Sequence, residues 1–484
     1  MMITSSSRPT AQASRTGSPD LETRIHGTLN RWPAVGLAVG VVGGDGVASF
    51  VTHGVADIAM RKPITADTVF RVASISKTFT AVAVLQLWEQ GSIDLDAPAD
   101  DYLRAYRLVA EDPRWRPATV RHLLTHTAGV PEVVPARGAF MPDFGESVKV
   151  GRPIPTLAEH YRGRLPLAAE PGTRFRYGNH GFATLGQIVE DVSGEPLDRY
   201  LRRHIFEPLG MDRSDLVRSD RVAPNLATGY EMSRSGPKAV APRDFITAGA
   251  ASVYSTPNDM ARYLAALLRG GRNDHGSVLE PTTVSMMFAP HYRPDPRIPG
   301  LGLAFWRGDL GGHPVVEHQG TLPGFHSQIF LAPDDGTAVM AFTNGSWRPD
   351  FWLPFEVSSI LRELIGVPED VIRTDVPRRP DTWSDLCGWY RLTGPLTDVR
   401  MRGMFGAGAE VFVRRGQLMM RALTPIPTLY RGFPLHPDDP EDPTVFRLDL
   451  RAFGLGSMRV VCAHDSGSPG RLHLEVMPLT LSKR

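Results

Sequence analysis

The sequence predicts a chain of two parts, a mixed α/β part that contains antiparallel strands and an all-β module at the C-terminal end. Residues 34–42 and 47–53 flank the turn signal Gly-Gly-Asp-Gly, which predicts a β-hairpin. An alternating pattern returns later and predicts three strands, the last two antiparallel neighbours, over residues 313–318, 326–331 and 337–343. Beyond residue 373, short β-like runs alternate with turn residues, which predicts a small barrel.

The stretch Phe70–Gly91 predicts a buried helix, because its apolar residues cover nearly all faces and Gly91 ends it. Ser74 and Lys77 are three residues apart near the expected N-terminus of this helix. Residues at this spacing share one helical face, so the hydroxyl and the amine can point into one cleft. The pair therefore has the form of a nucleophile beside a base.

The lysine at position 77 is informative because only five of the 53 basic residues are lysines. A guanidinium group keeps its proton in proteins, whereas a desolvated ammonium group can lose it. A single Ser-x-x-Lys match is more often a helix cap beside a solvated lysine. The chain has a second match, Ser235 to Lys238, but it lies in Gly/Pro-containing sequence with no helical pattern.

The composition indicates the general class of the protein. The chain has 484 residues, 42% of them apolar and 22% charged, with a formal net charge of +1, which is typical of a soluble globular chain of two or three domains. Nothing in this balance favours nucleic acid or a membrane surface as a partner. Residues 1–20 lack the apolar segment of a secretory signal, and no run approaches the roughly 18 apolar residues of a membrane span. We therefore expect a cytoplasmic protein.

No cofactor or metal is expected. Cys387 and Cys462 are too few for a disulfide framework or a Cys-rich metal site. His122 and His126 are four residues apart, as zinc ligands can be, but no third ligand is evident. Hydrogen bonding at a helix end is the expected role of these histidines.

Two further segments present polar groups on turns. Tyr177 and Asn179 follow a Pro-Gly turn and precede a helical pattern, and His318-Gln-Gly320-Thr321 lies between two predicted strands. A lone tyrosine of this kind is more often a half-buried core residue, and a lone strand-end histidine is usually satisfied by its neighbours. The glycines near His318 permit close approach of the backbone to a ligand. Residues 129–166 form the longest irregular stretch, which we expect to select the substrate.

Taken together, Ser74-Ile-Ser-Lys77, Tyr177-Gly-Asn179 and His318-Gln-Gly320 resemble the ordered motifs of the serine β-lactamase-like family. This family is the class C β-lactamase and penicillin-binding protein group, with esterase and D-aminopeptidase relatives. Flanking runs such as LLTHTAG, PGTRFRYGN and IFEPLGM are also similar, and the likeness covers about residues 24–365. The resemblance implies an antiparallel sheet flanked by helices, with a helical lobe and the active site between them.

The resemblance also implies roles. Ser74 would accept the acyl group, Lys77 would be its proton partner, and Tyr177 would be the second acid/base. Asn179 would position Lys77 and the substrate, His318 would stand where many relatives have Lys, and the N–H groups of Ser74 and Thr321, beside Gly320, would form the oxyanion hole. Which of Lys77 and Tyr177 takes the first proton stays open.

The expected domains are a disordered tail (1–22), a β-lactamase-like serine hydrolase domain (23–370) and a β-barrel-like domain (376–484), the last with a core that includes Trp389, Phe412 and Phe446. The expected activity is hydrolysis of a small-molecule ester by an intracellular esterase, since His318 and Gly178 depart from β-lactam-directed relatives and no G-x-S-x-G elbow occurs. The alternatives are a D-amino-acid peptidase or amidase, a β-lactamase, and a catalytically silent binding protein. The acyl group, the leaving group and the oligomeric state stay open.

Overall fold

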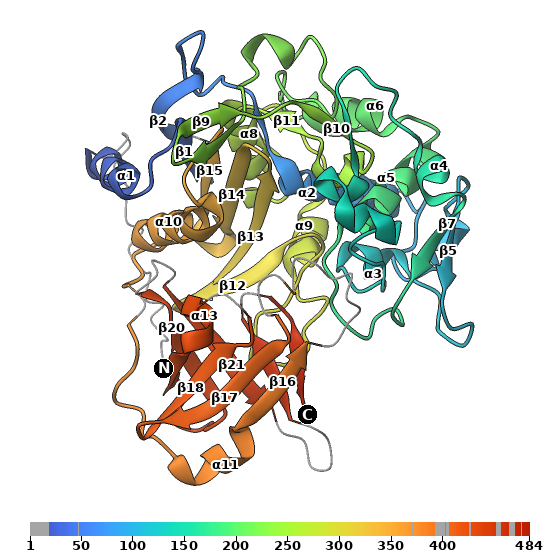
Figure 1. The fold of residues 1–484 in the computed structure, drawn as a ribbon. Helices are drawn as coiled ribbons and strands as arrows, with labels where there is room; N and C mark the ends of the chain where they lie inside the picture. Colours follow the sequence, from blue (N-terminus) through green and yellow to red (C-terminus); the bar gives the residue numbers. More distant parts are fainter. Residues whose placement is uncertain are drawn as a thin grey trace, which may run out of the picture.

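The computed structural model of the protein describes residues 19–484 except residues 47, 370, 393–401, 403–405, 425–426, 452–455, 464–469 and 476. Most of the predicted N-terminal tail, residues 1–18, lies outside the described residues, and the first helix, α1, begins at Pro19. Figure 1 shows two bodies, a large α/β part above and a barrel below it.

The large part is built on a seven-stranded antiparallel sheet with the order β12-β13-β14-β15-β1-β2-β3. The predicted N-terminal hairpin is β1–β2, and the three predicted later strands are β13, β14 and β15. Strand β1 lies between β2 and β15, so the two ends of this part of the chain meet in the middle of the sheet. The bounds are β1 Gly36–Gly43, β2 Ala48–Asp57, β3 Lys62–Pro63, β12 Trp306–Leu310, β13 His313–Leu322, β14 Phe325–Ala332 and β15 Thr337–Thr343.

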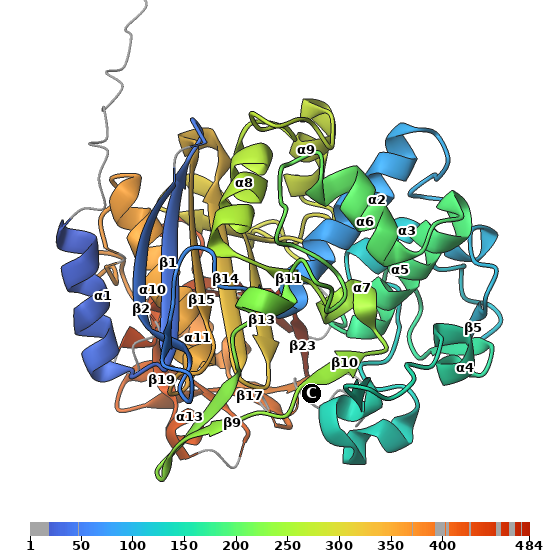
Figure 2. The ribbon, with the colours of Figure 1, turned by 90° about the horizontal axis from the view of Figure 1, so that it is seen from above.

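Both faces of the sheet are covered by helices, as Figure 2 shows. On one face, α1 and α10 bury a core that includes Ile25, Leu29, Val357 and Leu361. The other face packs against α8 and the helical lobe, where the largest apolar cluster of the chain lies. The bounds of these helices are α1 Pro19–Arg31, α8 Pro257–Leu268 and α10 Pro349–Leu364.

Helix α2 (Ser76–Glu89) runs through the middle of the molecule, and its residues from Ser76 to Leu87 are buried. Its apolar side chains therefore contact neighbours on every side, which agrees with the sequence pattern. The helix is preceded by a short strand and a single 3₁₀ turn, so the regular helix begins two residues after Ser74. The surrounding lobe contains β4 Phe70–Arg71, η1 Ala73–Ile75, α3 Val120–Leu124, α4 Leu157–Tyr161, α5 Asn179–Ser193, α6 Leu197–Leu201, α7 Ala248–Ala251 and α9 Pro281–Phe288.

Short two-stranded sheets tie the loops of the lobe together. Strand β4 pairs with β11 (Tyr254–Ser255), and β10 (Arg243–Phe245) pairs with β6 (Ser147–Lys149). The β6–β10 pair fixes the predicted irregular stretch, residues 129–166, against the segment that leads into α7. The other two pairs are β5 Arg107–Ala110 with β7 Arg164–Leu167, and β8 Tyr230–Ser233 with β9 Gly236–Ala239.

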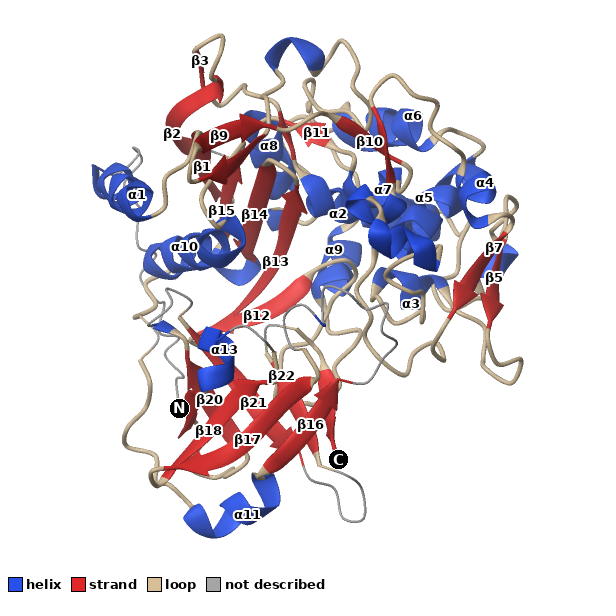
Figure 3. Cartoon of the chain, viewed as in Figure 1, coloured by secondary structure: helices blue, strands red, loops and turns tan. Residues whose placement is uncertain are grey.

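The C-terminal module is a closed barrel of eight strands in sequential order, β16 to β23 (Figure 3). Phe446 lies in its core, but Trp389 and Phe412 are only half-buried, and Phe412 lies against the guanidinium group of Arg421. The bounds are β16 Gly388–Leu392, β17 Gly408–Arg414, β18 Gln417–Ala422, β19 Phe433–Pro437, β20 Val445–Asp449, β21 Ser457–Ala463, β22 Arg471–Leu474 and β23 Thr480–Lys483, with helices α11 Trp383–Leu386 and α13 Pro427–Arg431.

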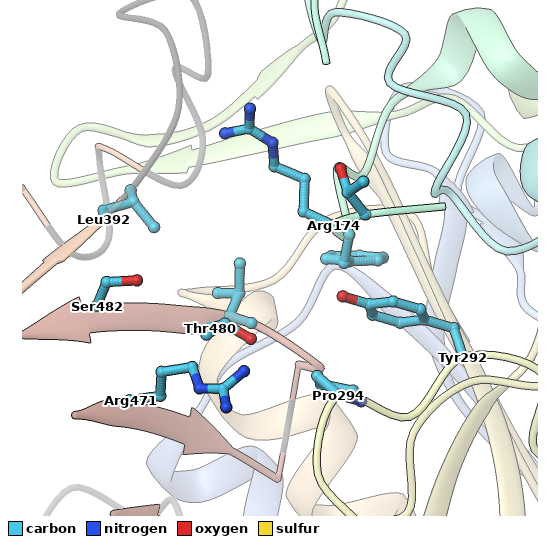
Figure 4. Close-up of a pocket in the computed structure, with 10 residues that line it drawn as sticks. Arg174, Tyr292, Pro294, Leu392, Arg471, Thr480 and Ser482 are labelled. Atoms are coloured by element: carbon cyan, nitrogen blue, oxygen red, sulfur yellow. The ribbon is translucent and has the colours of Figure 1, made fainter. Parts of the chain in front are cut away.

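The barrel packs against the α/β part through polar and apolar contacts. Arg297 donates hydrogen bonds to Asp442 (2.8 Å) and Thr444 (2.7 Å) of the barrel. Leu392 and Leu479 of the barrel share an apolar cluster with Phe175 and Leu301. A cavity of about 440 Å³ lies beside this cluster, and Figure 4 shows Arg174 and Tyr292 on one side of it and Arg471, Thr480 and Ser482 on the other.

Within the described part of the chain, no helix combines the length and the apolar character needed to cross a lipid bilayer.

Candidate active site

Ser74 lies in a tight turn whose geometry is fixed by several hydrogen bonds. Ala73, just before it, has φ +51°, a left-handed conformation that is strained for a residue with a Cβ atom. The Oγ of Ser76 donates to the carbonyl of Ala73 at 2.5 Å and accepts from the N–H of Val253 at 2.9 Å. The carbonyl of Val72 accepts from the Oγ of Ser327 at 2.8 Å. The turn is therefore held from both sides, and Ser74 itself stays half-buried beside the sheet edge.

Lys77 is completely buried and its ammonium group faces Ser74. Its Nζ donates to the Oγ of Ser74 (2.9 Å), to the Oδ1 of Asn179 (2.8 Å) and to the carbonyl of Ala250 (3.1 Å). Three acceptors match the three donors of an ammonium group. The amine of Lys77 is thus held within hydrogen-bond distance of the Ser74 hydroxyl.

A buried acidic residue holds Asn179. The Nδ2 of Asn179 donates to the Oε2 of Glu146 at 2.7 Å, and the same oxygen accepts from the Oγ1 of Thr247 at 3.1 Å. The Oε1 of Glu146 lies 3.8 Å from the Nε2 of His180, whose Nδ1 is 2.9 Å from the hydroxyl of Tyr161. Asn179, Glu146 and His180 are all buried, so this network lies in a medium of low polarity.

Tyr177 contacts both Lys77 and strand β12. The Nζ of Lys77 lies 5.0 Å from the centre of its ring. Its ring also contacts His126 (centroids 4.6 Å apart) and stacks on Trp306 (6.1 Å). These contacts hold the ring of Tyr177 beside Lys77. Burial, followed by the charge of Lys77, holds the pKa of His126 well below its usual value, so this histidine is neutral.

His318 is also buried, with 1% of its surface exposed, and its Nδ1 lies 2.8 Å from the carbonyl of Gln319. Burial, and then the nearby charge of Lys77, lowers the pKa of His318 to about 3. His318 is therefore neutral at neutral pH, unlike a lysine at this position.

Gly320 and Thr321 continue strand β13 past the nucleophile. A Cβ atom on Gly320 would lie 2.2 Å from the carbonyl of Val72 and 2.3 Å from the Oγ of Ser327, so only glycine allows the strand to approach the Ser74 turn this closely. The side chain of Thr321 is exposed and donates to Asp350 at 2.9 Å. The main chain of Thr321 is thus next to the turn that bears Ser74.

The structure brings all seven predicted residues to one region: Ser74, Lys77 and Asn179 form a continuous hydrogen-bonded chain, Tyr177 faces Lys77, and His318, Gly320 and Thr321 line the sheet edge. Sequence reasoning missed Glu146, Ser76 and Trp306. It expected His126 to form a hydrogen bond at a helix end, whereas the ring of His126 packs against Tyr177 and Phe182. Glu146 lies in the irregular stretch, where no periodic pattern marks it. Ser76 was inside the recognised motif but was not assigned a role.

The second Ser-x-x-Lys match and the histidine pair considered for zinc have structural surroundings of their own. The second Ser-x-x-Lys match lies on the exposed β8–β9 hairpin, where Ser235 contacts Ser233. His122 completes a capping box at the start of α3, where its Nδ1 accepts from the N–H of Thr119. Among the described residues, no three His, Cys, Asp or Glu side chains are arranged to hold a metal ion.

This arrangement can support acyl transfer to a serine hydroxyl. It provides a nucleophile, a buried amine beside it, a phenol ring near that amine and a sheet edge whose N–H groups can stabilise an oxyanion.

Two proteins with similar sequences indicate the relatives of this chain. It is 28% identical over 280 residues to a putative penicillin-binding protein, PbpX, of Bacillus subtilis, covering 57% of this chain and 62% of that one. It is 27% identical over 363 residues to the D-aminopeptidase of Gluconobacter oxydans, covering 74% of this chain and 64% of that one. The chain thus spans a little under two thirds of the length of these relatives.

Solved structures share the fold. The octameric penicillin-binding protein homologue of Pyrococcus abyssi matches with a TM-score of 0.60 and 24% identity, covering 96% of this chain and 99% of that one. EstCE1, described as a hydrolase with promiscuous acyltransferase activity, matches with a TM-score of 0.54 and 23% identity, covering 67% and 93%. The first match includes the barrel as well as the α/β part, because it covers nearly the whole chain.

The family model described as Beta-lactamase matches residues 29–351, which contain every residue of the site. The match covers more than half of the chain, and the nucleophile turn, the lysine and the sheet edge lie where the sequence motifs predict them. The chain therefore belongs to the beta-lactamase family.

Proposed function

We propose that this protein is a carboxylic esterase that cleaves small-molecule esters through an acyl-enzyme on Ser74. The observation that carries the choice of ester is the neutral, buried His318 on the sheet edge. A neutral imidazole gives no charge attraction to a carboxylate next to the scissile bond. Esters with no charged group next to the scissile carbonyl are therefore favoured over β-lactams, which carry a carboxylate there.

In the proposed mechanism, the Oγ of Ser74 attacks the ester carbonyl while its proton passes to Lys77 or Tyr177. The oxygen of the tetrahedral intermediate accepts hydrogen bonds from the N–H groups of Ser74 and Thr321. Collapse of the intermediate breaks the ester C–O bond, and the departing alkoxide takes a proton from Tyr177. Water then attacks the acyl-enzyme and loses its proton to the deprotonated Tyr177. A proton returns to the Oγ of Ser74 as the bond between Oγ and the acyl group breaks, which releases the carboxylic acid and restores the free serine.

A fluorophosphonate probe tests the nucleophile. The wild-type protein should be labelled and should hydrolyse p-nitrophenyl butyrate, and Ser74→Ala should lose both properties. Ser235→Ala is the matched control, because it removes the serine of the second Ser-x-x-Lys match, and it should behave as wild type. Labelling that survives Ser74→Ala and disappears in Ser235→Ala would overturn the proposal. A folded wild-type protein that is not labelled would favour a silent binding protein.

A second candidate is hydrolysis of D-amino-acid amides, and the D-aminopeptidase relative supports it. The two candidates differ in the bond cleaved, so D-alanine p-nitroanilide and p-nitrophenyl butyrate separate them. We expect the ester to be cleaved with the higher kcat/KM, and nitrocefin slowly or not at all. A higher kcat/KM for the anilide would replace the esterase by an aminopeptidase, and a higher value for nitrocefin would replace it by a β-lactamase.

A further inference from the structure

A second cavity of about 280 Å³ lies beside the nucleophile turn. Its lining includes Arg71 of β4, Phe245 of β10, Tyr254 of β11 and Leu322 at the end of β13. Figure 2 shows β10 and β11 close to the end of β13. Two of the lining residues are close in sequence to the candidate active site: Arg71 is three residues before Ser74, and Leu322 follows Thr321.

Positive charge dominates this cavity. Lys62, Arg71, Arg218 and Arg243 line it, against a single acidic residue, Asp143. The carboxylate of Asp143 forms an ion pair with Arg243 at 2.9 Å, so it neutralises the charge of that arginine alone. Neither Arg71 nor Arg218 forms an ion pair with a carboxylate among the described residues. The cavity therefore keeps an excess of positive charge.

Arg71 is the most deeply placed of these cations, with 9% of its surface exposed. Its guanidinium carbon lies 5.2 Å from the ring centres of both Phe245 and Tyr254. Its Nη1 donates to the carbonyl of Arg243 at 2.8 Å, while its buried Nε has no acceptor within the described structure. A buried guanidinium group with an unsatisfied N–H is costly unless an anion completes its environment.

The position of the cavity indicates which part of a substrate enters it. In the proposed function, the leaving group departs toward Tyr177, which lies against Trp306. The acyl group then extends away from Tyr177, past Ser74, toward β4 and the end of β13. Apolar lining residues such as Leu322 and Phe325 suit a hydrocarbon chain, and arginines line the same cavity.

We propose that this cavity binds a carboxylate at the far end of the acyl group, so that the substrates are monoesters of dicarboxylic acids. This inference rests on the proposed ester hydrolysis and adds the class of acyl group. Guanidinium groups bind carboxylates through paired, charge-assisted hydrogen bonds, and a partly buried site limits screening by salt. His318, near the reacting carbonyl, is neutral, whereas the cavity farther away is cationic. Together they favour an acyl group that has a negative charge only at the end far from the reacting carbonyl.

The test compares esters of equal length with and without the terminal carboxylate. Mono-p-nitrophenyl adipate is compared with p-nitrophenyl hexanoate, and mono-p-nitrophenyl suberate with the octanoate. We expect kcat/KM to be about tenfold higher or more for the acidic member of at least one pair. If neither acidic ester is preferred while both neutral esters are cleaved, the cavity does not bind the acyl carboxylate. If no ester is cleaved, the proposed function itself fails.

Variants connect the preference to the cavity. Arg71→Gln and Arg218→Gln should each lower the ratio of acidic to neutral kcat/KM by about threefold to tenfold. Arg116→Gln is the matched control, because Arg116 is exposed and outside the cavity, and it should leave the ratio unchanged. Arg218 is exposed at the rim, so its variant tests the idea even if Arg71→Gln does not fold by circular dichroism. Unchanged ratios in the folded variants would overturn the assignment.

Discussion

The Nδ2 of Asn179 donates a hydrogen bond to the Oε2 of Glu146 at 2.7 Å, and this bond fixes which end of the amide faces Lys77. The Oε2 of Glu146 accepts hydrogen bonds from Asn179 and from the hydroxyl of Thr247, so it holds the NH₂ end of Asn179. The Oδ1 end must then point to the ammonium group of Lys77. Glu146 is thus a positioning residue that acts on Ser74 through two intervening side chains.

Glu146→Gln should lower kcat about tenfold or more and change KM little. A glutamine can donate as well as accept, so the amide of Asn179 is no longer restricted to one orientation. Steady-state kinetics with p-nitrophenyl butyrate measures the effect. Thr247→Val removes the other hydrogen bond to the same oxygen and should cost less, because it leaves the contact with Asn179 in place. Equal losses in the two variants would contradict the positioning role.

Lys77→Arg should lower kcat/KM about 100-fold or more. The substitution keeps the positive charge, but a guanidinium group does not give up its proton and does not fit the three close acceptors of the Nζ atom. The rate of labelling by a fluorophosphonate measures Ser74 reactivity without turnover. Turnover near the wild-type rate would show that Lys77 acts only as a positive charge.

Much of the fold followed from local patterns. The N-terminal hairpin and the strands near residues 313–343 have strong periodicity, and the structure has them near the predicted positions. The helix predicted over residues 70–91 is present only over Ser76–Glu89, because a short strand and a 3₁₀ turn occupy residues 70–75. Strands β12, β19 and β23 were not predicted, and sheet and barrel pairing supplies what their sequences do not show.

The site was predictable only where residues are close in sequence. Ser74 and Lys77 share one turn, and Tyr177 and Asn179 share another, so local spacing identifies each pair. Glu146 contacts Asn179 across 33 residues of chain, in a segment without periodicity, and nothing local marks such a contact. Trp306 reaches Tyr177 from yet another element.

Gly320→Ala should destabilise the protein and remove most labelling. The added Cβ would meet the carbonyl of Val72 at 2.2 Å, so either β13 or the turn before Ser74 must move. Gly27→Ala is the control, because a Cβ there meets nothing within 4 Å and alanine favours the helix α1. We expect Gly27→Ala to be neutral or slightly stabilising in thermal unfolding. Normal labelling of Gly320→Ala would mean that the close approach of the strand is not needed.

His318 should make the protein less stable in mild acid. Its pKa is about 3 in the folded protein, below the unfolded value of about 6.5. Between these values the unfolded chain binds a proton that the folded chain does not. The free energy of unfolding therefore falls as the pH is lowered, by up to about 1.4 kcal/mol per pH unit from this group.

Urea unfolding of wild type and His318→Gln between pH 7 and pH 4 measures this contribution. The variant should lose less stability on acidification than the wild type, while His26→Gln, at an exposed position on α1, should follow the wild type. Parallel curves for wild type and His318→Gln would contradict the buried, neutral state of His318.

The barrel should affect catalysis through the apolar cluster beneath Tyr177. Leu479 of the barrel packs with Phe175 and Leu301, and half-buried Tyr177 and Trp306 lie against the same cluster. We still expect a chain ending near Asp375 to be labelled by a serine-directed probe but to show altered KM among esters. Point variants in the full chain separate this effect from loss of folding.

Leu479→Ala and Leu481→Ala are a matched pair. Both leucines are buried, but Leu481 lies in the core of the barrel itself, whereas Leu479 lies in the cluster that contacts the α/β part. Each substitution leaves a cavity and should cost about 2–5 kcal/mol of unfolding free energy. Only Leu479→Ala loosens the packing behind Phe175 and Tyr177, so only this variant should change kcat/KM, by about threefold to tenfold, among esters of different length. Equal kinetics in the two folded variants would mean that the barrel stabilises the chain without influencing the site.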